Sequence, residues 1–223
     1  MIHDASEIPN AELVRALSAP QPSARLKAAL RAGSDPRAGY VDLLIARCAV
    51  EPDFFVRDML TWALVRHDAA LTVSRPVAQL VSEVSQARSQ SLHTLSKIGD
   101  PSTWSFITRD LLTDIDAEVA RAAWRTAAAL VPMGEESALA ETLATQFGRG
   151  DRDVQLSLSR AFATLGTAVF AVVERAANSS DEIVRAHALA TVTVMRDPDA
   201  GFDSAIAEAK RTVALLGAPL IDE

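Results

Sequence analysis

The sequence repeats one helix-forming unit at intervals of 30–35 residues. Six positions are predicted to start the second helix of each unit: Gln21, Asp53, Val84, Asp116, Asp151 and Asp181. The residues 3 and 11 positions after each start are all apolar: Ala24, Val56, Ala87, Val119, Val154, Val184, Ala32, Leu64, Leu95, Ala127, Phe162 and Val192. With 49% hydrophobic residues, chance rarely produces such a set. This spacing places the apolar residues on one face of a helix.

A further amphipathic segment precedes most of these helices, so each unit is predicted to contain two helices. Its apolar positions include Tyr40, Leu44 and Cys48; Val77, Leu80 and Val81; Trp104, Ile107 and Leu111; Leu139, Leu143 and Phe147; Val169, Val172 and Val173. Asp35-Pro36, Asp100-Pro101 and Asp197-Pro198 are expected to begin helices, because Asp caps amides and Pro suits the first position. Strand-like alternation is missing from the sequence, which favours an all-α fold.

The units predict a single domain over residues 10–216. Residues 1–9 are expected to be a polar lead-in, and residues 217–223 a tail. The last helix, at about 199–216, would open a seventh, incomplete unit and cap the array. Stacked helix pairs bury a core that grows with each added repeat.

An arginine follows the first apolar position in four units, at Arg25, Arg57, Arg88 and Arg185. Together with Asp53 and Asp181 in the pattern Asp-x-x-Val-Arg, this resembles the HEAT repeat family, in its short bacterial-type units of about 31 residues. The resemblance implies a right-handed α-solenoid of six helix pairs whose second helices line a concave surface. It also implies a ladder of Asp–Arg bonds between neighbouring repeats. Ala120 and Gln155 replace the arginine in units four and five.

Charge and cysteine content suit a soluble cytoplasmic protein. The formal net charge is −7, which argues against wholesale coating of nucleic acid or anionic membranes. The single cysteine, Cys48, rules out an intrachain disulfide framework. The N-terminus lacks a signal-peptide pattern, and a run of ~18 apolar residues, as a membrane span needs, is not found.

A basic and aromatic stripe is predicted on the concave side. If positions 3, 7 and 11 after each helix start face inward, then positions 5, 9 and 13 face the opposite side. The candidate binding residues at these positions are Trp62, Arg66, His93, Lys97, Arg121, Arg125 and Arg160. Asp58 stands one turn before Trp62. For any single one of these arginines, an ordinary solvent-exposed cation is about as good an explanation as a binding residue.

Two functions fit this stripe. The simpler is a non-catalytic scaffold or adaptor that binds an acidic peptide or protein surface, with Trp62 as an anchoring contact. The alternative is a nucleic-acid binder, or a solenoid similar to the DNA glycosylases of alkylated bases, in which cations follow phosphates and Trp62 stacks on a base. A third class is an accessory to an enzyme, such as a lyase subunit or a chaperone. Trp104 and Trp124 are interpreted as packing residues.

Signatures of catalysis and of metal binding are missing from the sequence. It contains no His-Glu dipeptide, no H-x-x-x-H and no C-x-x-C spacing, so neither a metal nor another cofactor is expected. Gly148-Arg149-Gly150 is too short for a phosphate loop and is interpreted as a helix end. The sequence therefore predicts a binding protein rather than an enzyme.

Overall fold

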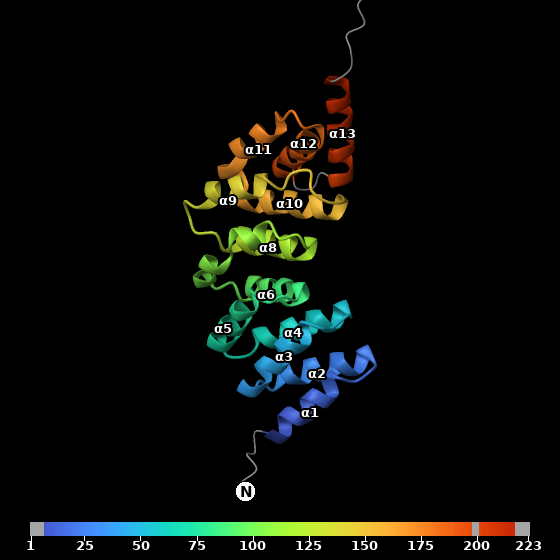
Figure 1. Ribbon diagram of the computed structural model, residues 1–223, viewed down its shortest axis with the longest axis vertical. Helices are drawn as coiled ribbons and strands as arrows, with labels where there is room; N and C mark the ends of the chain where they lie inside the picture. Colours follow the sequence, from blue (N-terminus) through green and yellow to red (C-terminus); the bar gives the residue numbers. More distant parts are fainter. Residues whose placement is uncertain (1–6, 198–200, 217–223) are drawn as a thin grey trace, which may run out of the picture. The chain divides into compact units, whose positions relative to one another are not determined.

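The computed structural model describes residues 7–197 and 201–216, and most of these residues lie in helices joined by short turns and loops (Figure 1). They form α-helices and three 3-10 helices, and the described ranges contain no β-strand. The all-α fold class predicted from the sequence is confirmed.

Most helices run for two to four turns. In chain order they are α1 (Glu7–Leu17), α2 (Pro22–Ser34), η1 (Ala38–Tyr40), α3 (Val41–Cys48), α4 (Phe54–Val65), α5 (Ala69–Gln79), α6 (Ser85–Ile98), η2 (Pro101–Phe106), α7 (Arg109–Leu112), α8 (Ala117–Leu130), α9 (Glu136–Ala144), α10 (Arg152–Leu165), η3 (Gly166–Val169), α11 (Phe170–Ala177), α12 (Glu182–Arg196) and α13 (Phe202–Leu216).

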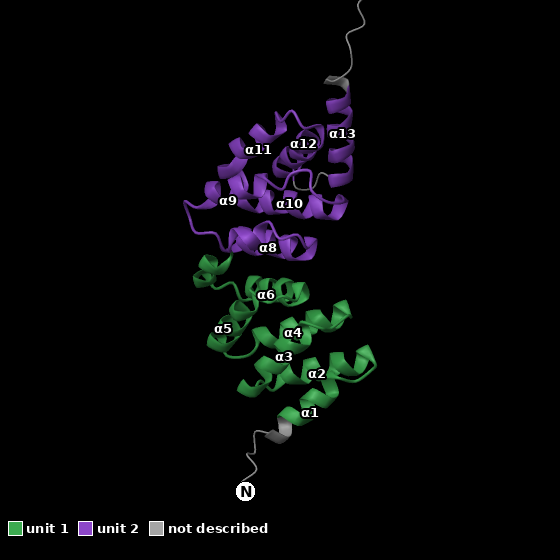
Figure 2. Cartoon of the chain, viewed as in Figure 1, with its two compact units in different colours: residues 1–107 green, residues 108–223 purple. Residues whose placement is uncertain are grey.

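Contacts within the chain group these helices into two compact units (Figure 2). Unit 1 extends to Ile107 and unit 2 begins at Thr108, so the division falls between η2 and α7, inside the region where the sequence predicts one domain. In unit 1, α4 packs between α2 and α6; in unit 2, α10 packs between α8 and α12, and α12 also packs against α13. In each unit the second helices of successive repeats are therefore direct neighbours.

The six predicted starts of second helices are confirmed as N-cap residues. Four are aspartates whose side chains accept hydrogen bonds from amides of the first turn; Asp116, for example, accepts from the amides of Glu118 and Val119. Gln21 and Val84 occupy the same place without a side-chain bond. Each Asp satisfies amides that the helix itself leaves free. The N-cap residues thus recur with the period of 30–35 residues that the sequence shows.

The predicted inward residues form the cores. Nine of the twelve are buried, and Ala24, Val184 and Val192 are half-buried. Trp124 is fully buried, and its Nε1 donates to the carbonyl oxygen of Leu112 at 2.7 Å, which confirms its packing role. Small residues dominate the interior of α8, where Ala120, Ala123 and Ala127 are fully buried. Alanine at these positions lets neighbouring helices approach closely.

Several first helices differ from the prediction. Asp35 does not cap a helix: it ends α2 and pairs with Arg37. Asp100 does cap, but the segment after it is split into η2 and the four-residue α7. Thr103 contributes to the split, because its hydroxyl donates to the carbonyl oxygen of Asp100 and favours a tight turn.

The first and last helices also differ from the prediction. Helix α1 begins at Glu7, inside the expected lead-in, and α13 begins at Phe202. The expected cap of that last helix, Asp197-Pro198, lies partly outside the described residues, as do residues 1–6 and the tail 217–223. Within the described range, Asp197 is the residue that ends α12.

The recurring arginine joins the two helices of its own repeat. The guanidinium groups donate to carbonyl oxygens five and six residues earlier, in the turn between the first and second helix. Arg25 donates to Ala19 and Pro20, Arg57 to Glu51 and Pro52, Arg88 to Ser82 and Glu83, and Arg185 to Ser179, at 2.7–3.3 Å. We call this contact the turn clamp.

The two aspartates of the Asp-x-x-Val-Arg pattern cap their own helices: the carboxylates of Asp53 and Asp181 accept from amides of the first turn. Arg25 also reaches the next repeat, because it donates to both oxygens of Glu51, at 2.7 and 2.8 Å. Glu51 is fully buried and also accepts from Arg47. Burial alone would raise the pKa of Glu51, but these bonds and the Asp53 amide lower it to about 2.

The fourth repeat has no clamping arginine of its own, and the fifth repeat supplies one. At Ala120 the carbonyl oxygens five and six residues earlier are those of Ile115 and Asp114, and Arg149 donates to both. Two glycines flank Arg149 with positive φ angles of 81° and 69°. At Gly150 a Cβ atom would lie 2.8 Å from Val154. The glycines of the Gly-Arg-Gly sequence therefore allow a backbone conformation in which the Arg149 guanidinium reaches the turn of the neighbouring repeat.

In the fifth repeat, a side-chain amide takes the place of the guanidinium. Gln155 stands at the clamping position, and its Nε2 donates to the carbonyl oxygen of Gly150, five residues earlier, at 3.3 Å. The clamp is thus present in all six repeats, although only four carry the arginine that the sequence pattern shows.

One stretch of the described chain, Arg152–Ala177, has the length and apolar composition of a membrane span. It consists of α10, η3 and α11, and Gly166 breaks it with φ 72° and ψ −154°. Leu158, Phe162, Val169 and Val173 are fully buried in unit 2. A core helix pair of a folded unit has these properties.

Replacing Arg149 by alanine should destabilise unit 2. Two turn carbonyls lose a charged donor, which we expect to lower the free energy of unfolding by about 2 kcal/mol. Urea unfolding followed by circular dichroism measures this loss. Arg175→Ala, at an exposed arginine, is the control, and equal stability of Arg149→Ala and Arg175→Ala would contradict the clamp.

Candidate functional site

Three of the predicted binding residues line one groove in unit 2. Arg121 and Arg125 lie one turn apart on α8, and Arg160 lies on the adjacent α10. The groove has a volume of about 430 Å³, and its other lining residues are Asp153, Leu156, Ser157, Ala161 and Thr164. These arginines are 5 or 9 positions after their N-caps, so the packing of α8 on α10 brings them together. We call this the arginine groove.

Two of the three guanidinium groups are available for a ligand. Arg121 pairs with Glu118 at 2.7 Å, whereas Arg125 and Arg160 are exposed and have no carboxylate partner among the described residues. Asp153, the acid that lines the groove, already pairs with Arg152 at 2.7 Å. Partial desolvation and the nearby Arg121 lower the pKa of Arg125, against the opposing effect of Glu118. An anionic group placed here would relieve that unfavourable environment.

In unit 1, Trp62 of α4 lies together with Arg66, the C-cap residue of that helix, and both contact α2. The Trp62 ring rests on Gly33, where a Cβ atom would lie 2.4 Å from the indole. The Arg66 guanidinium lies 4.8 Å from the ring centroid, and its Nε donates to the Gly33 carbonyl oxygen at 2.9 Å. Trp62 nevertheless stays 37% exposed. It therefore both packs between repeats and presents an edge to solvent.

His93 and Lys97 lie one turn apart on α6. Lys97 is exposed in the last turn of α6. His93 is half-buried and already interacts with other residues of the chain. The seven predicted residues thus fall into two sets, four in unit 1 and three in unit 2. The three arginines share one groove, and Trp62 shares a contact with Arg66.

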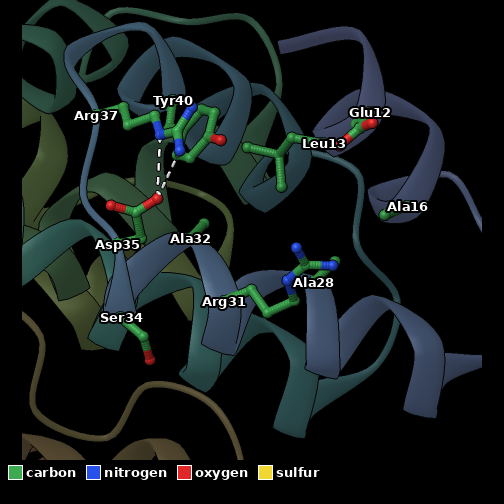
Figure 3. A pocket seen from close by; sticks show the side chains of 10 residues that line it. All are labelled: Glu12, Leu13, Ala16, Ala28, Arg31, Ala32, Ser34, Asp35, Arg37 and Tyr40. Atoms are coloured by element: carbon green, nitrogen blue, oxygen red, sulfur yellow. Dashed lines mark hydrogen bonds and ion pairs between the residues drawn. The ribbon is translucent and has the colours of Figure 1, made fainter. Parts of the chain in front are cut away.

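A pocket between α1, α2 and η1 has no counterpart among the sites predicted from the sequence (Figure 3). It has a volume of about 390 Å³ and is lined by Glu12, Leu13, Ala16, Ala28, Arg31, Ala32, Ser34, Asp35, Arg37 and Tyr40. The guanidinium of Arg37 donates to Asp35 at 2.7 and 3.1 Å. Two cations and two acids balance each other, so the pocket has no preferred charge. The Asp-Pro sequence of this loop predicts a helix start, so the sequence gives no sign of the pocket.

A buried polar cluster in unit 2 was also missed. His187 is almost fully buried on α12; its Nδ1 accepts from the Gly148 amide at 3.0 Å, so Nε2 carries the proton. Nε2 lies 3.0 Å from the Gln155 carbonyl oxygen and 3.2 Å from the Ser159 hydroxyl, which bonds Thr191. In this tautomer the ring cannot accept a proton from Ser159. The cluster ties α10 to α12 and is not arranged as a nucleophile and base.

The single cysteine is equally inert. Cys48 is buried in the core of unit 1, and burial raises the pKa of its thiol to about 12. The thiolate is the reactive form, so Cys48 is a packing residue at neutral pH. Groups of three or more His, Cys, Asp or Glu side chains that can hold a metal ion do not occur in the described ranges.

Comparisons with known proteins give no family. The sequence matches no protein-family model and no curated protein. Among solved structures, a similar chain is an engineered protein from a structural genomics consortium, with 19% identity over 84% of this chain and 96% of that chain and a TM-score of 0.46. Another is the complex of CpcE and CpcF of phycocyanin lyase from Nostoc sp., with 20% identity, 93% and 83% coverage and a TM-score of 0.41. Likenesses at these TM-scores carry no information about function.

The buried His187 predicts a loss of stability in mild acid. Desolvation lowers the pKa of His187 from the usual 6.5 to about 4, although the hydrogen bond to Gln155 acts in the opposite direction. Between these pH values the unfolded chain binds a proton that the folded chain does not, so the free energy of unfolding falls as pH falls. The loss should be roughly 3 kcal/mol in total.

Urea unfolding at pH 7 and pH 4.5 measures this loss. His187→Gln keeps an acceptor for the Gly148 amide but does not titrate, so its stability should depend less on pH across this window. The same pH dependence in both proteins would show that other groups cause it.

Proposed function

We propose that this chain is a HEAT-like repeat protein that binds an acidic segment of a partner protein in the arginine groove. The observation that carries the proposal is the pair of exposed guanidinium groups, Arg125 and Arg160, which lack a carboxylate partner in the described part of a chain whose net charge is −7. An acidic protein that keeps unpaired cations together in one groove presents a local site for anions.

The repeat architecture is part of the proposal. Its support is the recurrence of one N-cap, one turn clamp and one inward apolar face in each of six helix pairs. In the proposed arrangement the pairs continue as a right-handed solenoid, α13 caps it, and the second helices line its concave side. The arginines would then face the partner, because they stand at the positions opposite the buried face.

The groove favours a protein partner by its mixed chemistry. Leu156 and Ala161 supply apolar surface beside the guanidinium groups, and Thr164 and Ser157 supply hydroxyls. A carboxylate can accept two parallel hydrogen bonds from one arginine, so two free arginines match two acidic residues of the partner. The adjacent apolar surface would contact the side chains between them.

A nucleic-acid partner has less support. Phosphate tracking needs a run of cations along the strand, and base stacking needs an open aromatic face. Arg66 covers a face of Trp62, and the edge of the ring rests on Gly33. We therefore propose binding without catalysis, in the cytoplasm, as the role of this chain.

Reversing the charge of the groove should abolish the interaction. The probe is a fluorescein-labelled 16-residue helical peptide with glutamates four residues apart and leucines between them. We expect it to bind the wild-type chain, and Arg125→Glu and Arg160→Glu each to weaken binding at least about tenfold, measured by fluorescence anisotropy. Raising NaCl from 50 to 300 mM should weaken binding as well.

Arg211→Glu on α13 is the matched control, because it makes the same change of charge at an exposed arginine outside the groove. A peptide with lysines in place of the glutamates should not bind the groove. Equal weakening by Arg211→Glu and Arg125→Glu would reduce the effect to overall charge and overturn the site. Tighter binding of a 20-nucleotide single strand than of the peptide, lost with the groove variants, would favour nucleic acid.

A further inference from the structure

The pocket between α1, α2 and η1 contains a nearly buried hydroxyl group that folding leaves without a partner. Tyr40 is only 9% exposed, and its hydroxyl makes no hydrogen bond among the residues that the structure describes. Figure 3 shows this hydroxyl on the side of the ring that faces Leu13, inside the pocket. Buried hydroxyl groups in proteins are normally hydrogen-bonded, so the Tyr40 hydroxyl is available to a ligand.

Three other polar side chains of the pocket already have partners within the chain. The Arg37 guanidinium donates to the carboxylate of Asp35 at 2.7 and 3.1 Å. The hydroxyl of Ser34 donates to the carbonyl oxygen of Leu30, one turn earlier on α2, at 2.9 Å. The charges of Arg37 and Asp35 therefore cancel, and this side of the pocket does not need a charged ligand.

One cation and one carboxylate remain, and they belong to different helices. Arg31 of α2 and Glu12 of α1 are both exposed, and neither side chain has a hydrogen bond or an ion pair in the described ranges. The pKa of Arg37 is raised chiefly by its hydrogen bond to Asp35, and Glu12 adds a weaker attraction from beyond ion-pair distance. The pocket thus has two walls of opposite charge that do not neutralise each other.

Apolar side chains line the rest of the pocket. Leu13 and Ala16 come from α1, and Ala28 and Ala32 come from α2. Leu13, Ala28 and Ala32 are buried, so they form a fixed part of the core of unit 1. The volume of about 390 Å³ lies within the range of roughly 300–1,000 Å³ that is typical of small-molecule sites. Such sites combine an apolar lining with a few polar groups that orient the ligand.

We propose that this pocket binds a small zwitterion, an ω-amino acid that carries its ammonium and its carboxylate at the two ends of a short apolar chain. The carboxylate accepts hydrogen bonds from the Arg31 guanidinium and from the Tyr40 hydroxyl, and the ammonium donates to Glu12. The methylene groups of the ligand cover Leu13 and Ala28. The pocket lies in unit 1, so this proposal does not depend on the arginine groove of unit 2.

Other classes of small ligand leave a charge of the pocket without a partner. An anion bound at Arg31 would meet the unpaired Glu12 as a like charge, and a cation bound at Glu12 would meet Arg31 in the same way. An uncharged apolar molecule would remove water from both groups and replace none of their hydrogen bonds, which is costly. A zwitterion supplies a partner for each charge.

Titrations of the full chain with 4-aminobutanoate and 6-aminohexanoate, followed by NMR, test the proposal. At least one of the two should bind saturably. Its analogues of equal length that lack the ammonium or the carboxylate should bind at least about tenfold more weakly. Leucine should also bind more weakly than the ω-amino acid, because it carries both charges on one carbon and cannot reach both walls.

Exchange of the two charges of the pocket separates a direct contact from a general effect. Glu12→Arg and Arg31→Glu should each weaken binding at least about tenfold. The double variant should bind more tightly than either single variant, because the ligand can then enter in the reverse direction. Tyr40→Phe should weaken binding about three- to tenfold, through the loss of one hydrogen bond.

Arg15→Glu is the matched control, since Arg15 is an exposed arginine of α1 that does not line the pocket. Arg125→Glu in unit 2 should also leave binding unchanged, and circular dichroism shows whether each variant is folded. Four results would overturn the proposal: no saturable binding of either ω-amino acid, equal binding of leucine or of the analogues with one charge, equal weakening by Arg15→Glu and Arg31→Glu, or a folded double variant that binds no better than the single variants.

Discussion

The turn between the two helices of each repeat depends on a donor for its carbonyl oxygens. A helix that ends close to the start of the next leaves backbone acceptors without partners, and unsatisfied acceptors near a core are costly. Arginine satisfies two of them from one side chain, and its aliphatic part packs along the second helix. Each second helix is thereby fixed to the first helix of its repeat. The positions of the outward residues of α4, α8 and α10 depend on how the second helix packs on the first.

Local rules made the helices predictable. Aspartate before an apolar period gave four second-helix starts, and the same period located Gln21 and Val84 although neither side chain caps. The inward positions followed from helical geometry alone. The first helices were harder, because Asp35 found Arg37 as a partner and the segment after Asp100 carries threonine and serine, which compete for backbone hydrogen bonds. Propensity without packing could not decide those cases.

The candidate site was predictable in part. Counting positions from Asp116 and Asp151 placed Arg121, Arg125 and Arg160 on neighbouring outward faces, where the structure has them in one groove. Counting could not tell which arginines are free, because pairing depends on side chains such as Glu118. It also gave no sign that Arg25, Arg57, Arg88 and Arg185 donate to turn carbonyls.

The contact of Arg149 with an earlier turn has a consequence for the order in which the repeats fold. The clamps of Arg25, Arg57, Arg88 and Arg185 close within six residues, so these turns can form as soon as the second helix is synthesised. The turn before α8 must wait for a side chain 34 residues further along. Contacts of greater sequence separation form later in folding and cost more chain entropy. On the ribosome, the fourth repeat would therefore remain incomplete until the loop after α9 has emerged, which couples the folding of these two repeats.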